Sequence, residues 1–190
     1  SFSLSSKIPR VLGIEPVVLN AVYYHNGSSV SSTRSAVEQS PTTLVVLQHG
    51  LLGSSRNLGS TAKLLSAALP PCVALAAVDL RNHGTSPQTD EFRAIAMAKD
   101  LDNLVADFSE KCSSVTKAAV IGHSLGGAVV VSALRRVAAA ESAQSLQDRA
   151  EHELPALAKY LHAAIVVDIC PDIRPVKAMN NVEHIFRTMM

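Results

Sequence analysis

Hydrophobic residues recur along this chain as short continuous runs, and polar turns or amphipathic stretches separate one run from the next. Five of the runs have the length of a strand, and only the first partly alternates with polar positions. Short runs of aliphatic and β-branched residues are typical of strands buried on both faces of a parallel sheet. We therefore expect strands at residues 17–25, 43–48, 72–79, 116–121 and 162–170.

Helical periodicity fills the intervals between these runs. Residues 94–110 place Leu101, Leu104, Val105 and Phe108 on one face at helical spacing, which predicts an amphipathic helix. Other helices are expected at 60–69, begun by a Ser60 or Thr61 cap and ended by Pro70-Pro71; in the Ala/Val-rich stretch up to about residue 140; and from about residue 180.

The alternation of strands and helices predicts an α/β fold, with a mostly parallel sheet and crossover helices on both of its faces. A length of 190 residues indicates one domain. Residues 26–41 are rich in Gly, Ser and Thr and indicate a flexible loop. Residues 141–155 are polar and indicate an exposed helical insertion.

Composition narrows the possible partners. Apolar residues make up 47% of the chain and aromatic residues only 4%, so we expect a core built from aliphatic side chains. A formal net charge of +1 gives no electrostatic reason to expect nucleic acid as a partner. No apolar stretch reaches the roughly 18 residues that a membrane-spanning helix needs.

The cysteines and the N-terminal residues bear on the compartment. The three cysteines form no C-x-x-C pair, which argues against a metal or redox site and fits a reducing compartment. Residues 1–10 contain serines and two basic residues but no acid, as at the end of a mitochondrial targeting segment. We therefore expect the protein in the mitochondrion or the cytoplasm.

The pattern Gly122-x-Ser124-x-Gly126 carries the chemistry, because it lies between a predicted strand and a predicted helix. That context is required of a nucleophile elbow, in which a strained turn lifts a serine above the edge of the sheet. Small residues are needed two positions before and after the serine, and Gly122 and Gly126 supply them. Ser124 is therefore the expected nucleophile of an acyl-transfer reaction.

A second glycine-bounded turn, His49 to Gly53, follows an earlier predicted strand. Acyl transfer needs two N–H groups to stabilise an oxyanion. In a nucleophile-elbow enzyme one of them belongs to the residue after the nucleophile, here Leu125, and the other to a loop after a preceding strand. For the second donor we expect Leu51, next to Gly50, with Leu52 as the alternative.

A serine nucleophile also needs a histidine base and an acid that orients it, in the chain order serine, acid, histidine. Asp168 ends a predicted strand at the same sheet edge as Ser124 and is the expected acid, with Asp172 as a weaker candidate. No histidine completes the set. His152 falls in the polar insertion, His162 begins a strand, and His184 falls in a predicted helix.

The two histidines that flank the motifs, His49 and His123, precede the serine, so we expect them to shape loops through hydrogen bonds. The acyl-enzyme route requires no metal and no organic cofactor, and none is expected.

Four spaced segments together resemble one branch of the α/β-hydrolases, that of the mitochondrial abhydrolase domain-containing protein eleven and related bacterial short-acyl esterases. The similarity covers roughly residues 43–175, and its segments are HGLLGSSRNLGS (49–60), DLRNHGTSP (79–87), GHSLGG (122–127) and VVDICP (166–171). The resemblance implies an α/β-hydrolase fold with Ser124 as nucleophile, Asp168 as acid, and Leu51 and Leu125 as oxyanion donors. It implies a structural role for the turn that contains His83.

The resemblance also implies a division of the chain. Residues 1–16 would be a tail, 17–175 a partial hydrolase core and 176–190 the start of a helical cap. Within the core, 141–160 exceeds the family's usual link, and Ala128 stands where relatives often carry Lys. The rest of the cap, the last strands and the catalytic histidine would lie downstream, so we expect little activity from this fragment.

These observations leave more than one function open. The leading hypothesis is a carboxylesterase-like serine hydrolase acting on a small or lipid-like ester or thioester. The alternative is a non-catalytic relative, used for binding or regulation, that lacks the histidine. A carbon–carbon bond hydrolase, a haloperoxidase or an acylglycerol lipase on the same scaffold is a third possibility.

Overall fold

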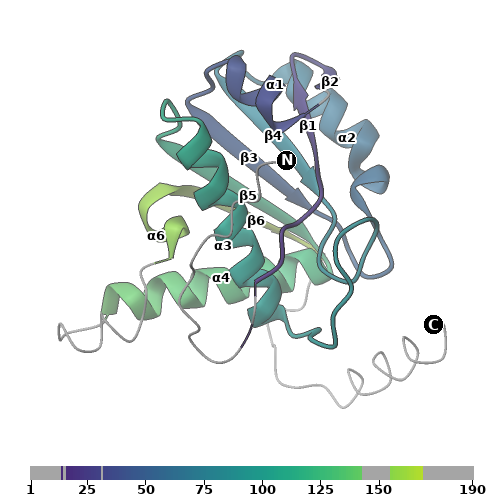
Figure 1. The fold of residues 1–190 in the computed structure, drawn as a ribbon, viewed down its shortest axis with the longest axis vertical. Coiled ribbons are helices and arrows are strands. Elements are labelled where there is room, and N and C mark those ends of the chain that lie inside the picture. Colours follow the sequence, from purple (N-terminus) through teal and green to yellow (C-terminus); the bar gives the residue numbers. More distant parts are fainter. Residues whose placement is uncertain (1–13, 15, 31, 143–154, 169–190) are drawn as a thin grey trace, which may run out of the picture.

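A computed structural model describes residues 14, 16–30, 32–142 and 155–168 of the chain. Its central element is a six-stranded sheet with the strand order β2-β1-β4-β3-β5-β6 (Figure 1). Strand β1 pairs antiparallel with β2 and β4, whereas the β4–β3, β3–β5 and β5–β6 pairs are parallel. The strands are β1 (Ala21–His25), β2 (Ser28–Val30), β3 (Thr43–Gln48), β4 (Val73–Val78), β5 (Lys117–His123) and β6 (Leu161–Val167).

The central strands are buried on both faces, as their continuous apolar sequences predict. In β3, Leu44 and Val46 face one hydrophobic cluster, whereas Val45 and Leu47 face the other. The neighbouring strands β4 and β5 divide their side chains in the same alternating way. This period-two division of the side chains requires helices on both sides of the sheet.

Helices cover both faces (Figure 1). Helix α2 packs on β4, and its Ala62 belongs to the smaller cluster. Helices α3 and α4 pack together over the other face, where Leu101, Phe108 and Val129 lie in the larger cluster. The helices are α1 (Thr33–Glu38), α2 (Ser55–Ala68), α3 (Ala94–Lys111), α4 (Leu125–Ser142) and α6 (Ala156–Tyr160).

The prediction for residues 26–41 was wrong, because they hold β2 and α1. Strand β2 pairs with β1, and the turn between them contains Gly27 at φ +76°. Ala36 of α1 is buried in the larger cluster. The segment is therefore part of the packed domain.

The predicted start of helix α2 was also wrong, since the helix begins at Ser55 and includes Gly59. Its cap is Ser54, whose backbone N–H donates to the side-chain oxygen of Asn57 at 2.8 Å. Ser55 is buried and its N–H donates to the Asp79 carboxylate at 2.6 Å, a contact that anchors the helix five residues before Ser60. The predicted end before Pro70-Pro71 was correct.

Strand β6 contains an irregularity in its pairing with β5. Ala118 lies opposite Leu161 and Ala119 lies opposite Ala163, so one step along β5 spans two steps along β6 and His162 is the additional residue. After this bulge the pairing is regular up to His123 and Val167. Ile165, Val166 and Val167 of β6 are exposed.

The segment before β6 joins the packed domain at Leu157 of helix α6. Leu157 is fully buried, and its N–H donates to the Asp102 carboxylate of α3 at 2.9 Å. Residues 143–154, the middle of the predicted insertion, and the predicted final helix both lie outside the described residues. None of the helices in the described part of the chain is long and apolar enough to cross a membrane.

Candidate active site

Ser124 occupies a sharp turn between the end of β5 and the start of α4. Its φ is +51°, a left-handed conformation that ordinary side chains rarely adopt. The Ser124 N–H donates to the Val167 carbonyl of β6 at 2.9 Å, and its carbonyl accepts from Ala128 at 3.0 Å. The turn is therefore anchored to the neighbouring strand on one side and to the first turn of α4 on the other.

Two glycines make this turn possible. A Cβ atom on Gly122 would lie 2.2 Å from the carbonyl oxygen of Gly126. A Cβ atom on Gly126 would lie 2.7 Å from the backbone oxygen of Gln48 and 2.8 Å from that of His49. Both neighbours are backbone atoms that cannot rotate away. The close approach also lets the Gly126 N–H donate to the His49 carbonyl at 3.1 Å.

The turn after β3 lies directly beside Ser124. A Cβ atom on Gly50 would be 3.2 Å from the Ser124 Cβ. The turn is closed by the Gly53 N–H, which donates to the Gly50 carbonyl at 3.0 Å. Leu51 and Leu52 are its central residues, and Leu52 has a φ of +60°. The N–H that closes the turn belongs to Gly53, so the Leu51 N–H takes no part in that hydrogen bond.

Leu125 is the first residue of α4. The N–H groups in the first turn of a helix have no acceptor within the helix, and the helix dipole favours negative charge there. The structure thus brings Ser124, Leu125 and the Gly50–Leu51 turn to one place at the carboxyl edge of the sheet.

Asp168 follows β6 at the same edge, one residue after the Val167 carbonyl that binds Ser124. Its φ is +56°, and its side chain is 83% exposed. An Asp168 carboxylate oxygen lies 3.6 Å from Nε2 of His123, a half-exposed residue that directly precedes the nucleophile. Asp168 is therefore near the nucleophile, as the sequence predicts, and its ion-pair partner among the described residues is His123.

Of the three histidines that follow Ser124 in the sequence, one lies among the described residues. His162 is exposed and lies at the start of β6, at the opposite edge of the sheet from Ser124, as predicted. His152 and His184, together with Asp172, lie outside the described residues.

The ring of His49 packs against the backbone of the turn after β3. It is buried, and its Nδ1 lies 2.7 Å from the Gly50 carbonyl oxygen. The Leu80 N–H donates to its Nε2 at 3.1 Å. Burial lowers the pKa of His49, the hydrogen bond to Gly50 opposes that effect, and His83, 5.0 Å away between ring centroids, lowers it further. The loop-shaping role expected of His49 thus involves hydrogen bonds with Gly50 and Leu80.

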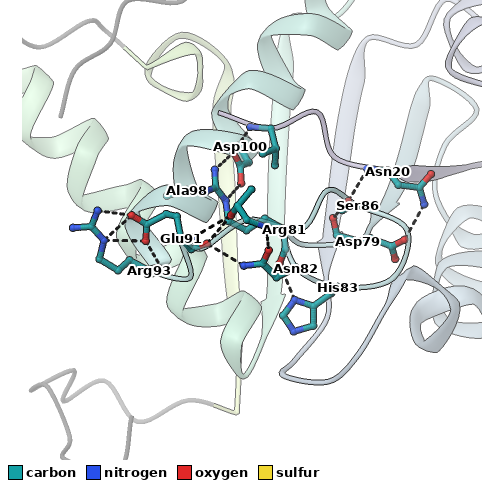
Figure 2. Close-up of polar contacts among 12 residues, drawn as sticks. Asn20, Asp79, Arg81, Asn82, His83, Ser86, Glu91, Arg93, Ala98 and Asp100 are labelled. Carbon is teal, nitrogen blue, oxygen red and sulfur yellow. Dashed lines mark hydrogen bonds and ion pairs between the residues drawn. The ribbon is translucent and has the colours of Figure 1, made fainter. Parts of the chain in front are cut away.

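The loop after β4 is organised around the buried carboxylate of Asp79 (Figure 2). This carboxylate accepts from the Ser55 N–H at 2.6 Å, the Asn20 side chain at 2.9 Å and the Thr85 N–H at 2.9 Å. Burial alone would raise the pKa of Asp79, but these hydrogen bonds outweigh it and lower the pKa to about 2. A Cβ atom on Gly84 would lie 2.3 Å from the carboxyl group, so the loop needs a glycine there.

A buried ion pair fixes the same loop to helix α3 (Figure 2). Nε and one terminal nitrogen of Arg81 donate to the two carboxylate oxygens of Asp100 at 2.6 and 2.7 Å. The side chains are 1% and 0% exposed. The sequence pattern alone did not predict this pair. The available signal was a carboxylate at position 100, on the apolar face that Met97, Leu101 and Leu104 define.

The chain is similar to a known protein family and to several known proteins. A profile described as the alpha/beta hydrolase family matches residues 44–187. Esterase YbfF of Escherichia coli (strain K12) is 39% identical over 99 residues, which are 52% of this chain and 35% of that esterase. The sn-1-specific diacylglycerol lipase ABHD11 of Mus musculus is 35% identical over 83 residues, which are 44% of this chain and 25% of the lipase.

Among solved structures, a marine microorganism esterase matches with a TM-score of 0.57 and 21% identity, over 91% of this chain and 51% of that one. At this identity the match is evidence about the fold alone. The chain spans about a third or less of the length of the two curated relatives.

Proposed function

Because the chain belongs to the alpha/beta hydrolase family, we propose that the protein is a serine hydrolase that cleaves carboxylic esters or thioesters through an acyl-enzyme at Ser124. The family match, with relatives named as an esterase and as ABHD11, confirms the resemblance seen in the sequence and the α/β-hydrolase fold. The family match and the names of these two relatives support a hydrolase as the coarse class. The ester specificity and the residue roles are our proposal.

The conformation of Ser124 is the observation that carries the proposal. A serine at φ +51° is strained by about 1–2 kcal/mol relative to a helical or extended one, and here the surrounding glycines and hydrogen bonds hold it. The turn keeps the side chain beside Gly50 at the edge of the sheet. Strain that is maintained at a strand-to-helix turn is typical of a nucleophile.

In the proposed reaction, Ser124 Oγ bonds to the acyl carbon while its proton passes to a base. The N–H groups of Leu51 and Leu125 donate to the oxyanion of the tetrahedral intermediate. Collapse of the intermediate expels the alcohol or thiol, which takes up that proton, and water then releases the acid by the reverse sequence. Asp168 would orient the base, which we place outside the described residues.

The substrate class follows from this chemistry and from the relatives. An ester or thioester supplies the carbonyl and the leaving group that the step needs, and relatives named as an esterase and as a diacylglycerol lipase act on such bonds. No nucleic acid is required as a partner. We place the protein in the mitochondrion or the cytoplasm, because its cysteines form no C-x-x-C pair and fit a reducing compartment.

The test is hydrolysis of a short p-nitrophenyl ester by the natural full-length protein and its Ser124→Ala variant. We expect the variant to lose at least ~10³-fold in kcat, because the bond-forming atom is removed. Ser60→Ala, an exposed change in α2, is the matched control and should leave the rate unchanged. Full activity in Ser124→Ala would refute the assignment.

A second candidate function is that of a non-catalytic binding or regulatory protein. It is favoured by Asp168, whose ion-pair partner among the described residues is His123, a residue that precedes the nucleophile. A fluorophosphonate probe separates the two candidates. Ser124-dependent labelling of the full-length protein supports the hydrolase, and no labelling supports the non-catalytic alternative.

A further inference from the structure

The ring of His49 lies between the turn after β3 and the first residues of the loop after β4. Its exposed fraction is 1%. Nε2 faces the Leu80 N–H at 3.1 Å, and Nδ1 faces the Gly50 carbonyl oxygen at 2.7 Å. A Cβ atom on Gly53 would lie 3.0 Å from Nδ1, so the ring fills the space beneath the turn.

These contacts fix the protonation state of the ring. A backbone N–H can only donate, so Nε2 must carry a lone pair toward Leu80. A neutral imidazole then has its proton on Nδ1, where it donates to the Gly50 carbonyl. The same carbonyl also accepts from the Gly53 N–H at 3.0 Å. Two donors therefore hold the Gly50 carbonyl toward the ring.

The direction of this carbonyl determines the direction of the next N–H. In a trans peptide unit the C=O of Gly50 and the N–H of Leu51 point to opposite sides, and the described residues contain no cis peptide bond. Holding the carbonyl toward His49 therefore aims the Leu51 N–H away from the ring. Gly50, the other half of this peptide unit, lies beside Ser124.

A second proton on His49 would disrupt this arrangement. It would have to bind Nε2, and two donors, the new N–H and that of Leu80, would then face each other. The titratable groups around the ring are His83 and Asp79 from the loop after β4, with His123 across Gly50 at the end of β5. Burial and His83 lower the pKa of His49, while Gly50 and Asp79 raise it.

We propose that His49 is a positioning residue that, as a neutral ring protonated on Nδ1, aims the Leu51 N–H at the oxyanion, and that a second proton on the ring releases the turn. The inference rests on the proposed function for its catalytic consequence. His49 touches no substrate and acts through the Gly50–Leu51 peptide unit. The pKa of His49 lies below its usual value of about 6.5, so the neutral ring dominates at pH 7 and is lost only as the pH falls through that lowered pKa.

The first experiment determines the tautomer directly, by long-range ¹H–¹⁵N NMR of the histidine rings in the full-length protein. We expect His49 to show a protonated Nδ1 and an unprotonated Nε2 at pH 7, with protonation only below the ordinary histidine range. A protonated Nε2 or a charged ring at pH 7 would overturn the inference. This measurement needs no activity, so it tests the protonation state of His49 even if the proposed function fails.

The second experiment replaces the ring by amides that cannot take up a proton near neutral pH. His49→Asn can keep a donor near the Gly50 carbonyl, whereas His49→Gln can reach the Leu80 N–H and loses that donor. We expect kcat to fall in both variants with little change in KM, and to fall more in His49→Gln. The fall should stay within the ~10²–10³-fold that loss of one oxyanion donor produces.

The pH profile distinguishes positioning from simple packing. In the natural protein the rate of phosphonylation of Ser124 should fall in a step that follows His49 protonation, below the ordinary histidine range, and this step should be absent in His49→Asn. His162→Asn, at the opposite edge of the sheet, should leave both rate and profile unchanged. Unchanged kcat in both His49 variants, in a protein whose labelling depends on Ser124, would overturn the inference and leave the proposed function intact.

Discussion

Three of the six non-glycine residues that have positive φ in the described part of the chain lie at the proposed active site. Ser124, Leu52 and Asp168 all have positive φ, and they come from three different segments of the chain. Each such residue costs about 1–2 kcal/mol, a cost that the surrounding structure must offset. The glycines on either side of Ser124 are one source of that support, because they let α4 approach the ends of β3 and β5.

The two glycines Gly122 and Gly59 should respond in opposite ways to the same added methyl group. In Gly122→Ala the methyl would lie 2.2 Å from the backbone oxygen of Gly126, and we expect a loss of about 1–3 kcal/mol in the free energy of unfolding. In Gly59→Ala, within α2, the nearest atom is the Tyr24 hydroxyl at 3.4 Å. There we expect a gain of about 0.5–1 kcal/mol.

Urea denaturation measures both changes, and the helix variant serves as the control for the elbow variant. If Gly122→Ala proved as stable as the natural protein, the elbow would be looser than its geometry indicates.

The role of a residue could be predicted from the sequence only where residues close to it in the chain determine that role. Ser124 and its glycines form one short motif, so their arrangement followed from spacing. The partners of His49 did not, because the Leu80 N–H comes from 31 residues away. Buried contacts across two loops leave no local signal in the sequence.

Among the elements, α3 contributes both packing and charge to the site. Leu101, Val105 and Phe108 of this helix form its apolar stripe, as predicted. Asp100 lies beside them and anchors Arg81, so the helix also fixes the loop after β4. Helix α2 contributes in the same way, because the Ser55 N–H at its start binds Asp79.

Replacing one partner of the buried Arg81–Asp100 pair should lower the free energy of unfolding more than replacing both partners. In Asp100→Asn the Arg81 charge stays buried beside a neutral partner, and we expect a loss of about 3–5 kcal/mol in the free energy of unfolding. The double variant Arg81→Met with Asp100→Leu should recover much of that loss, since no charge is then buried. The exposed pair of Lys111 and Asp107 in the same helix is the control, and Lys111→Ala should cost less than about 1 kcal/mol.

Chemical denaturation of the three variants at pH 7 would measure these differences. If the double variant proved less stable than Asp100→Asn, the attraction within the ion pair would exceed the free-energy cost of removing both charges from water.

The ends of helix α2 depend on capping interactions that could be predicted only in part from the sequence. The Pro70-Pro71 pair ends α2 as predicted, because proline cannot continue a helix. The start was predicted from a Ser60 or Thr61 cap, but the helix begins at Ser55, whose N–H binds the distant Asp79 carboxylate.

At the scale of the molecule, the alternation of strands and helices was enough to predict the sheet. The apolar runs are buried on both faces, and parallel strands bring their carboxyl ends to one edge. Antiparallel β1 and β2 were harder to predict, since β2 is three residues long in a Gly/Ser/Thr-rich stretch.

The stability of the whole fold should depend on pH through Asp79. Its pKa of about 2 in the fold lies below the unfolded value of 3.8, so it contributes stability that is present above pH 4 and is lost as the pH falls toward 2. We expect this residue to account for about 2 kcal/mol of the loss over that range. Asp79→Asn should be less stable at pH 7 and should lack this part of the pH dependence.

Urea unfolding at pH 7, 4 and 2.5 tests the prediction, with the exposed Asp107→Asn as the control. Parallel pH curves for the natural protein and Asp79→Asn would show that other carboxylates account for the acid sensitivity.

The bulge at His162 affects how this domain tolerates changes in chain length. One residue of β6 has no opposite residue on β5 at that point, yet the pairing recovers before Val167 and Asp168. Loss of one residue there would leave a regular ladder and the same ending, whereas loss of one after the bulge would turn every following side chain to the other face. A deletion at the bulge itself would therefore leave the candidate acid in its place at the edge of the sheet.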